Sequence, residues 1–559
     1  MEHERVVRGG LVVDGSGGEP VAADVAIDDG VITEIGVGVA GADTIDADGA
    51  VVIPGIVDLH THYDPQVLWD PRLSPSSQLG VTAVVAGNCG FSVAPCPPSM
   101  RASLMRTLEG VEDMRLATLE AGLEWDFESY GEYLAAVGRR GTAINYGGYV
   151  GHTPVRMSVM GDDAYERLAS DDEVEQMRAI VAASIRAGAL GFSSDRSPFH
   201  KGDGGRRVPS AVASQGELEA LWASVAEVGW GLIHVAPGED YAWVYEAQPR
   251  VGRPVTWSAI LAYPPAATSK APWAAKLADH RAGLDAGADV HPQVTCRPIS
   301  FQVSMADPST FYTLPSFGPV MAASREARAA LYRDPAWREQ AKAEIDGGRH
   351  IDVRWDTFTV AETSGPHGGR TIGDLAREGG EHPFDVALDL ALRDDLETRF
   401  TVVFANDDPD AVSALLTAEG CVMGLSDAGA HVGQMCDAVM PVDYLASWVR
   451  DRGVTTLEEG VRRVTGELAD LIGLSDRGHL RVGAAADVVV LDWDQLAPGP
   501  IRRVTDFPGG GDRLVADQPE GIRHVLVNGV AIRSDHQPVA GDPRPGQLLR
   551  NRPGGTHHG

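Results

Sequence analysis

The segment GIVDLHTHYDP, residues 55–65, places two histidines one residue apart, His60 and His62. It follows a run of valine, isoleucine and proline that predicts a short strand. Residues two apart on a strand point to the same face and lie roughly 6.6 Å from each other. Both imidazoles are then able to reach one metal ion at about 2.0–2.1 Å each. The pair is therefore a candidate for two ligands of one metal ion.

Three further residues with metal or acid–base chemistry stand at the ends of predicted strands. Cys89 lies in the turn GNCG, His234 lies near the end of the run WGLIHVA, and Asp427 ends GLSD. Taken singly, a structural histidine or a small buried thiol explains each of the first two. Taken together with His60 and His62, the residues favour a metal site. A thiolate and neutral imidazoles suit Zn²⁺, so we expect one or two zinc ions, with another divalent metal as the alternative.

The elements that must position these residues alternate between short apolar strands and longer amphipathic stretches. After the strand that carries His60, we predict strands at residues 80–87, 142–151, 188–195, 230–236, 254–260, 288–295 and 421–427. Helical patterns such as residues 171–188 and 216–229 lie between them. Eight strands in such an alternation predict an α/β fold built on a (β/α)₈, TIM-like barrel. Functional side chains of that fold come from the C-terminal ends of the strands.

Both ends of the chain have a different residue pattern from the middle. Residues 1–54 and 478–535 contain short apolar runs separated by Gly and Asp turns, which predict one small β-sandwich domain assembled from both ends. The barrel is then expected over residues 55–477. Within it, residues 298–400 are too long for one connection and predict an insertion that covers one mouth of the barrel. Residues 536–559 are rich in Gly, Pro and Arg and predict a loose tail.

Composition narrows the class of protein. The net charge of −32 argues against nucleic-acid binding, because a polyanion requires a basic face. Five cysteines without CxxC spacing fit a reducing compartment. No signal peptide and no apolar run of about 18 residues is apparent. We therefore expect a cytoplasmic protein that acts on a small molecule without membrane association; a homo-oligomer stays open.

Several motifs are familiar. PGIVDLHTHYD at residues 54–64 resembles the first-strand signature of the metal-dependent amidohydrolase superfamily. GVTAVVAGNCGFSVAP at residues 80–95 is similar to its D-aminoacylase branch, the N-acyl-D-amino-acid deacylases. GHLRVGAAADVVVLD at residues 478–492 and GIRHVLVNGVAI at residues 521–532 also resemble that branch, so the resemblance spans nearly the whole chain.

The resemblance implies a role for each strand-end residue. His60 and His62 would be the first-strand metal ligands, Cys89 a thiolate ligand, and His234 the fifth-strand ligand. Asp427 would be the eighth-strand general base, which takes a proton from the attacking water and hands it to the leaving amine. The implied reaction is hydrolysis of a linear amide, with an N-acyl-D-amino acid or a related small molecule as the substrate.

The chain departs from the family pattern at two places. The branch ends its sixth strand with a ligating histidine, whereas this strand carries Ser258 and no His, Cys or Asp. The branch also has an Arg soon after the eighth-strand Asp, where this chain has His431. Arg297 is the preferred substitute as an anchor for the substrate carboxylate, and Arg196 is a second candidate. His152 matches a family position and is expected to line the pocket.

Three other functions stay open on the sequence. One is hydrolysis of a cyclic amide by the same superfamily, with Cys89 in place of a bridging lysine. Another is a barrel without catalysis that has lost a metal ligand at Ser258, although the strand-end carboxylate of Asp427 argues against it. The third is a hydrolase with Cys89 as its nucleophile, which the His-x-His spacing disfavours.

Overall fold

A computed structural model of the chain describes residues 2–198, 200–264, 270–308, 311, 313–321, 323–348 and 353–550. These residues form two compact units by their contacts. The first contains Met1–Leu261, Trp273–Arg297 and Asp410–Gly559, and the second contains Ala262–Pro272 and Pro298–Pro409. No described helix is both long and apolar enough to cross a membrane.

The core of the first unit is an eight-stranded parallel sheet. Its strands are β6 (Ile56–Asp58), β7 (Val81–Ala86), β8 (Asn145–Gly151), β9 (Gly191–Asp195), β10 (Leu232–Ala236), β11 (Val255–Trp257), β12 (Val290–Val294) and β16 (Val422–Met423). They neighbour each other in chain order, and a parallel bridge between Thr61 and Ala428 joins the segments that follow β6 and β16. All eight predicted strands are confirmed, and the α/β class with them. The order and the bridge are those expected of a (β/α)₈ barrel.

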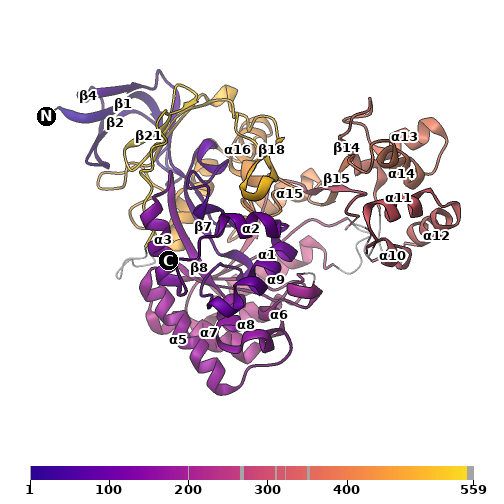
Figure 1. Cartoon of the computed structure of the whole chain (residues 1–559). Helices are drawn as coiled ribbons and strands as arrows, with labels where there is room; N and C mark the ends of the chain where they lie inside the picture. Colours follow the sequence, from indigo (N-terminus) through magenta and orange to yellow (C-terminus); the bar gives the residue numbers. More distant parts are fainter. Residues whose placement is uncertain are drawn as a thin grey trace. The chain divides into compact units, whose positions relative to one another are not determined.

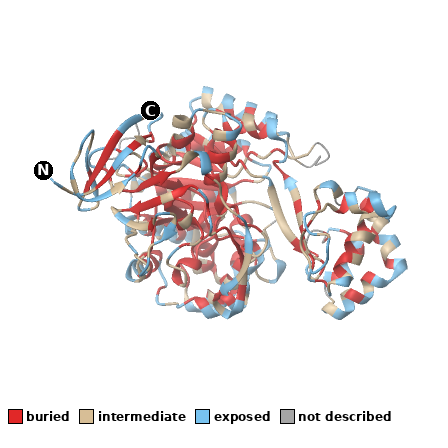
Figure 2. Cartoon of the chain, turned by 90° about the horizontal axis from the view of Figure 1, so that it is seen from above, coloured by how far each residue is buried: buried red, intermediate tan, exposed pale blue. Residues whose placement is uncertain are grey.

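Burial explains why the sequences of these strands are continuous apolar runs rather than alternations of apolar and polar residues. All six residues of β7 are buried, as are all five of β10. Figure 2 shows the buried residues concentrated in the strands and the exposed ones on the outer helices. Strands of a parallel sheet are covered on both faces, so both faces carry apolar side chains.

Each parallel strand after β6 is followed along the chain by one or more helices. They are α1 (Arg101–Glu112), α2 (Leu116–Gly122), α3 (Tyr130–Arg140), α4 (His152–Met160), α5 (Asp171–Ala187), α6 (Pro209–Val212), α7 (Gln215–Val228), α8 (Ala242–Val251), α9 (Trp273–Asp285), α15 (Pro409–Leu416), α16 (Met440–Asp443), α17 (Leu457–Val464) and α18 (Gly466–Ile472). The predicted helix at residues 171–188 begins where Ser170 and Glu173 form a capping box. It ends at Gly188, whose φ of 124° no L-residue adopts readily. Local capping thus determines the length of α5.

Strands from the two ends of the chain share one nine-stranded sheet. They are β1 (His3–Val12), β2 (Val21–Asp28), β3 (Val31–Gly36), β4 (Gly41–Asp46), β5 (Val51–Pro54), β17 (Val488–Leu491), β20 (Ile522–Val527), β21 (Val530–Ser534) and β22 (Gln537–Pro538). The central contact is antiparallel pairing of β5 with β17. Figure 1 shows strands from both ends of the chain, among them β1, β2 and β21, in this part of the first unit. The packing of this sheet as a sandwich stays a prediction.

The tail was expected to be loose from residue 536, and that expectation is wrong for its described part. Gly546 and Leu548 form bridges to Thr142 and Tyr146. Leu549 is 3% exposed, and its N–H donates to the carbonyl of Tyr146 at 2.8 Å. Two leucines in a Gly- and Pro-rich segment supply enough apolar surface to anchor it. Residues 551–559 lie outside the described part of the chain.

The second unit has its own core. Antiparallel strands β13 (Ile299–Ser304), β15 (Arg399–Ala405) and β14 (Thr359–Glu362) form its sheet. Its helices are α10 (Gly318–Met321), α11 (Arg325–Arg333), α12 (Pro335–Asp346), α13 (Ile372–Gly379) and α14 (Pro383–Arg393). A cluster of buried aromatic side chains, among them Phe311, Phe317 and Phe384, fills it. The expected place of the insertion over a mouth of the barrel stays a prediction.

Gly191 provides a test of how closely the parallel strands approach. Its φ is 156°, and a Cβ there would lie 1.8 Å from the carbonyl oxygen of Leu232 in β10. We expect Gly191→Ala to reduce the free energy of unfolding by about 2–3 kcal/mol, because the neighbouring backbone must move. Gly229→Ala is the control, since Gly229 has φ of 92° but no atom within 4 Å of its Cβ position. Equal shifts of the urea midpoint in both variants would contradict the argument.

Candidate metal centre

Two buried histidines follow the first parallel strand and lie close together. β6 ends at Asp58, and His60 and His62 follow it with their ring centroids 5.3 Å apart. The N–H of His62 donates to the carbonyl of Ala428 at 2.7 Å, which ties the pair to the last strand. His60 and His62 are 0% and 5% exposed. The predicted common face of the two imidazoles is therefore present, close to the eighth strand.

An unusual turn presents Cys89. Gly87, Cys89 and Gly90 have φ values of 77°, 52° and 77°, all in the left-handed region. A Cβ on Gly87 would lie 2.3 Å from the carbonyl oxygen of Tyr149, and one on Gly90 would lie 2.9 Å from the nitrogen of Asp195. The glycines of GNCG are therefore required by close backbone approach. The turn places Cys89 Sγ 3.5 Å from His60 Nε2.

His234 in β10 and Asp427, which follows β16, complete the group. The His234 ring lies 5.0 Å from the His60 ring, and its Nδ1 accepts a hydrogen bond from the N–H of Cys89 at 3.2 Å. Asp427 Oδ1 lies 3.1 Å from His60 Nε2 and 3.6 Å from His62 Nε2. The structure thus brings together all five residues that the sequence nominated as ligands or base.

The donor atoms fit a divalent cation in two overlapping sets. One set is His60, His62 and Asp427, and the other is His60, Cys89 and His234; within each, the candidate ligand atoms lie within 4.8 Å of one another. Two imidazoles with a carboxylate, or two imidazoles with a thiolate, are donor sets that Zn²⁺ accepts. Because His60 belongs to both sets, they are parts of one centre.

Electrostatics at the centre favour a positive charge. Burial works to lower the pKa of His60, but the charges of Cys89 and Asp427 outweigh it and raise that pKa to about 10. Burial works to raise the pKa of Cys89, but the two first-strand histidines lower it below its usual value. Burial and the same two histidines hold the pKa of His234 well below its usual value, so His234 is neutral. The negative charges that hold a proton on His60 also favour a metal cation there.

Two residues that the sequence did not indicate orient the first-strand histidines. Gln293 in β12 accepts a hydrogen bond at Oε1 from His60 Nδ1, 2.5 Å away, while its Nε2 donates to Thr256. Glu112, the last residue of α1, lies 3.1 Å from His62 Nδ1 through its Oε1. Gln293 sits on an identifiable strand, so its position was open to prediction. Nothing in the local sequence connects the end of α1 with the first strand.

The predicted substrate-binding residues have more varied surroundings. Ser258 lies beside the donor set, with its Oγ 3.3 Å from His234 Nε2. His152 is fully buried, with Nδ1 2.8 Å from Ser194 Oγ and Nε2 3.0 Å from Glu217 Oε1. The backbone N–H of His431 donates to the carbonyl of Glu112 at 2.7 Å. Of the three side chains, Ser258 has the clearest contact with the centre.

The two arginines have partners within the chain. Arg297 Nε lies 2.7 Å from Asp437 Oδ1, and its Nη1 lies 2.9 Å from Asp443 Oδ2. The guanidinium of Arg196 lies 5.9 Å from the centre of the Trp243 ring. Two carboxylates already balance the charge of Arg297, which weakens the case for it as the anchor of a substrate carboxylate.

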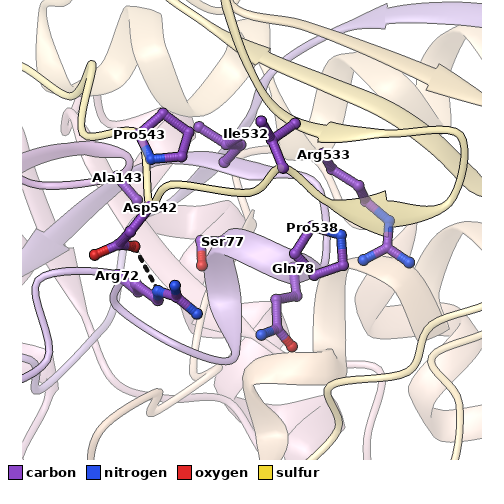
Figure 3. Close-up of a pocket in the computed structure, with 10 residues that line it drawn as sticks. Arg72, Ser77, Gln78, Ala143, Ile532, Arg533, Pro538, Asp542 and Pro543 are labelled. Atoms are coloured by element: carbon purple, nitrogen blue, oxygen red, sulfur yellow. Dashed lines mark hydrogen bonds and ion pairs between the residues drawn. The ribbon is translucent and has the colours of Figure 1, made fainter.

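A pocket of about 40 Å³ lies elsewhere in the first unit, between the terminal sheet and residues 72–78. Arg533 and Pro538 line it from the C-terminal strands, and Figure 3 shows Arg72 paired with Asp542 at its edge. The five described donor residues are not among its lining side chains. This pocket is therefore not the candidate site.

The fold and the donor set define a class: an α/β protein of eight parallel strands whose strand ends are suited to a divalent cation. The chain belongs to the amidohydrolase family, whose sequence model matches residues 43–532. It is accordingly a hydrolase of carbon–nitrogen bonds other than peptide bonds, and the resemblance to the D-aminoacylase branch is confirmed.

Relatives in that branch match along almost the whole chain. The N-acyl-D-glutamate deacylase of Alcaligenes xylosoxydans xylosoxydans is 30% identical over 570 residues, which cover 98% of this chain and 96% of the relative. The crystal structure of N-acyl-D-glutamate deacylase from Bordetella bronchiseptica, complexed with zinc and a phosphonate inhibitor, is 26% identical with a TM-score of 0.65, covering 98% of this chain and 100% of that chain. A D-aminoacylase structure, 23% identical with a TM-score of 0.67 and the same coverage, shares the fold.

The pKa differences among the cysteines lead to a chemical test. Burial raises the pKa of Cys96, Cys421 and Cys436 to about 12 and that of Cys296 well above its usual value. Cys89 alone has a lowered pKa and partial exposure. We expect iodoacetamide at pH 7 to alkylate Cys89 in metal-free protein at least tenfold faster than the other four, because the thiolate is the reactive form.

Peptide mass spectrometry measures this labelling. Added zinc should protect Cys89, and the four buried cysteines serve as internal controls. Labelling of Cys89 at the rate of the buried cysteines, or labelling that zinc does not slow, would contradict the assignment of Cys89 as a ligand.

Proposed function

We propose that the protein is a zinc-dependent amidohydrolase that cleaves the linear amide bond of an N-acyl amino acid, most closely an N-acyl-D-amino acid. The observation that carries the proposal is the position of Asp427. Its carboxylate lies within 3.1 and 3.6 Å of the two first-strand histidines, at the end of the last parallel strand. The relatives named as deacylases of N-acyl-D-glutamate support the substrate class.

The residues that would hold the metal are His60, His62, Cys89, His234 and Asp427, whose donor atoms group as described above. A divalent cation bound there lowers the pKa of a water ligand and polarises a carbonyl oxygen. Gln293 and Glu112 contact the Nδ1 atoms of His60 and His62, so the Nε2 atoms of both histidines are directed toward Asp427. Such contacts hold the orientation of each imidazole ring, so that its Nε2 faces the other donor atoms.

Asp427 is the group that moves the proton. Burial works to raise its pKa, but the adjacent histidines lower it well below the usual range, so the carboxylate is ionised at neutral pH. It takes a proton from the attacking water as the water oxygen bonds to the carbonyl carbon. It returns that proton to the amine nitrogen as the carbon–nitrogen bond breaks. One carboxylate thus serves as general base and then as general acid.

On the substrate side, Ser258 is our first candidate because of its contact with His234. His431, which follows Asp427 and contacts the end of α1, is the second. Arg297, Arg196 and His152 stay as weaker candidates, since carboxylates, an aromatic ring and a buried glutamate already engage them.

Removal of the proton carrier tests the proposal. We expect Asp427→Asn to reduce kcat on N-acyl-D-amino acids about 10²–10⁴-fold, because an amide accepts no proton in this step. The assay follows amine release by zinc-loaded protein over a panel of N-acyl-D- and N-acyl-L-amino acids, with hydantoin and dihydrouracil as cyclic amides.

Asp487→Asn is the matched control. Asp487 is a buried carboxylate that precedes β17 and pairs with Arg477, so its replacement should affect stability and leave kcat unchanged. Faster hydrolysis of the cyclic amides by the wild type would exclude the proposed substrate class. Full activity of Asp427→Asn would exclude the proposed role of the carboxylate.

A further inference from the structure

Arg533 in β21 is a buried arginine whose charge has no counter-charge in the described part of the chain. It is 4% exposed. Its Nε donates to the carbonyl of Ile522 at 2.9 Å, and its Nη2 donates to the carbonyl of His536. Its Nη1 is buried and has no hydrogen-bond partner among the described atoms. Burial lowers the pKa of Arg533 below the usual value of a guanidinium, and no neighbouring charge offsets this effect.

The other buried arginines of the described chain all have a carboxylate beside them. In each case a carboxylate oxygen lies within 4.0 Å of the guanidinium, in the pairs Arg156–Glu217, Arg463–Glu467, Arg477–Asp487 and Arg513–Asp506. Taking a charge out of water is costly unless an opposite charge compensates it. Arg533 departs from the pattern of the other four, so an anion from outside the chain would supply the compensation that it lacks.

Arg533 lines the pocket between the terminal sheet and residues 72–78. Figure 3 shows it on the opposite side of this pocket from Arg72 and Asp542, which pair with each other. Among the described lining residues, Arg533 therefore carries the one charge without a counter-charge. The centre of a water molecule fits within about 40 Å³ of the pocket, inside about 400 Å³ of empty space that opens to solvent. A small solute is able to enter.

The rest of the lining indicates the chemistry of that solute. The apolar part of the wall comes from Ala143, Ile532, Pro538, Val539 and Pro543. Gln78 also lines the pocket, and its buried Oε1 has no partner among the described atoms. One uncompensated positive charge favours an anion with a single negative charge, and apolar walls favour a ligand with a short hydrocarbon part.

We propose that this pocket is a binding site for a short-chain monocarboxylate anion such as acetate or propionate, with Arg533 as its counter-ion. The carboxylate accepts a hydrogen bond from Arg533 Nη1, and the alkyl group packs against Ile532 and Pro538. An anion bound there stabilises the folded chain, because it binds the folded state and not the unfolded one. The donor residues of the metal centre do not line this pocket, so the inference is independent of the proposed function.

The experiment titrates the full-length protein with sodium propionate in a calorimeter, at constant ionic strength, with zinc and after zinc removal. We expect saturable binding under both conditions. Arg533→Gln should weaken it about 10–100-fold, the range that loss of a charge-assisted hydrogen bond gives. Phosphate should bind more weakly than propionate, because its second negative charge finds no partner. Propionate should also raise the thermal midpoint of the wild type more than that of Arg533→Gln.

Arg502→Gln is the matched control, because Arg502 lines a neighbouring pocket that also includes Gln78 and pairs there with Asp517. It removes the same charge, and propionate affinity should stay within about twofold of wild type because salt screens an exposed pair. If Arg533→Gln fails to fold, wild-type crystals soaked in propionate decide the matter.

Four results would overturn the inference. They are an absence of propionate binding or binding only in the presence of zinc, equal affinity of the wild type and Arg533→Gln, tighter binding of phosphate than of propionate, and soaked crystals that hold only water beside Arg533 Nη1.

Discussion

A junction between residues 58–62 and residues 426–428 carries the candidate metal centre. Ser426 Oγ lies 2.6 Å from Asp58 Oδ2 and 2.9 Å from the carbonyl oxygen of His60. Thr61 pairs with Ala428 in the same region. The two segments are more than 360 residues apart in the chain, so His60 and Asp427 meet only when all eight strands are in place. The site is therefore complete only in the folded chain.

That junction also concentrates buried charge. Two histidines, a thiol and two carboxylates lie together with little exposure to water, an arrangement that is unfavourable unless opposite charges and hydrogen bonds compensate it. Short-range pairs within the chain compensate these buried charges. Asp427 pairs with His60, Glu112 with His62, and Gln293 with Nδ1 of His60. A divalent cation would compensate the same negative charges, so metal binding and stability of the folded state are coupled.

Under the proposed function, the departures from the family pattern concern the contacts of the substrate more than the reaction. Asp427 lies beside the His-x-His pair, as the proposed proton transfer and metal binding require. Ser258 instead contacts His234, and Arg297 is held between Asp437 and Asp443. Family membership therefore supports the reaction class, whereas the contacts of a substrate depend on side chains particular to this chain.

Much of the fold followed from local patterns. Apolar runs separated by amphipathic stretches predicted all eight strands, and an amphipathic pattern predicted the helix at residues 171–188 that the structure has as α5. Strand periodicity also predicted that His60 and His62 share a face, and placement at strand ends nominated Cys89, His234 and Asp427. These features can be predicted from the sequence because hydrophobic periodicity and residue propensity act over a few neighbouring residues.

Other features were decided only by tertiary packing. Glu112 stands at the end of an ordinary helix, and only the approach of α1 to the first strand makes it a partner of His62. The ion pairs of Arg297 and the docking of Leu549 beside Tyr146 likewise join segments that no local repeat relates. By itself the sequence determined which residue types end which strands. The tertiary structure decided which distant side chains orient them, because the free energy of such a contact depends on burial and distance in the folded chain.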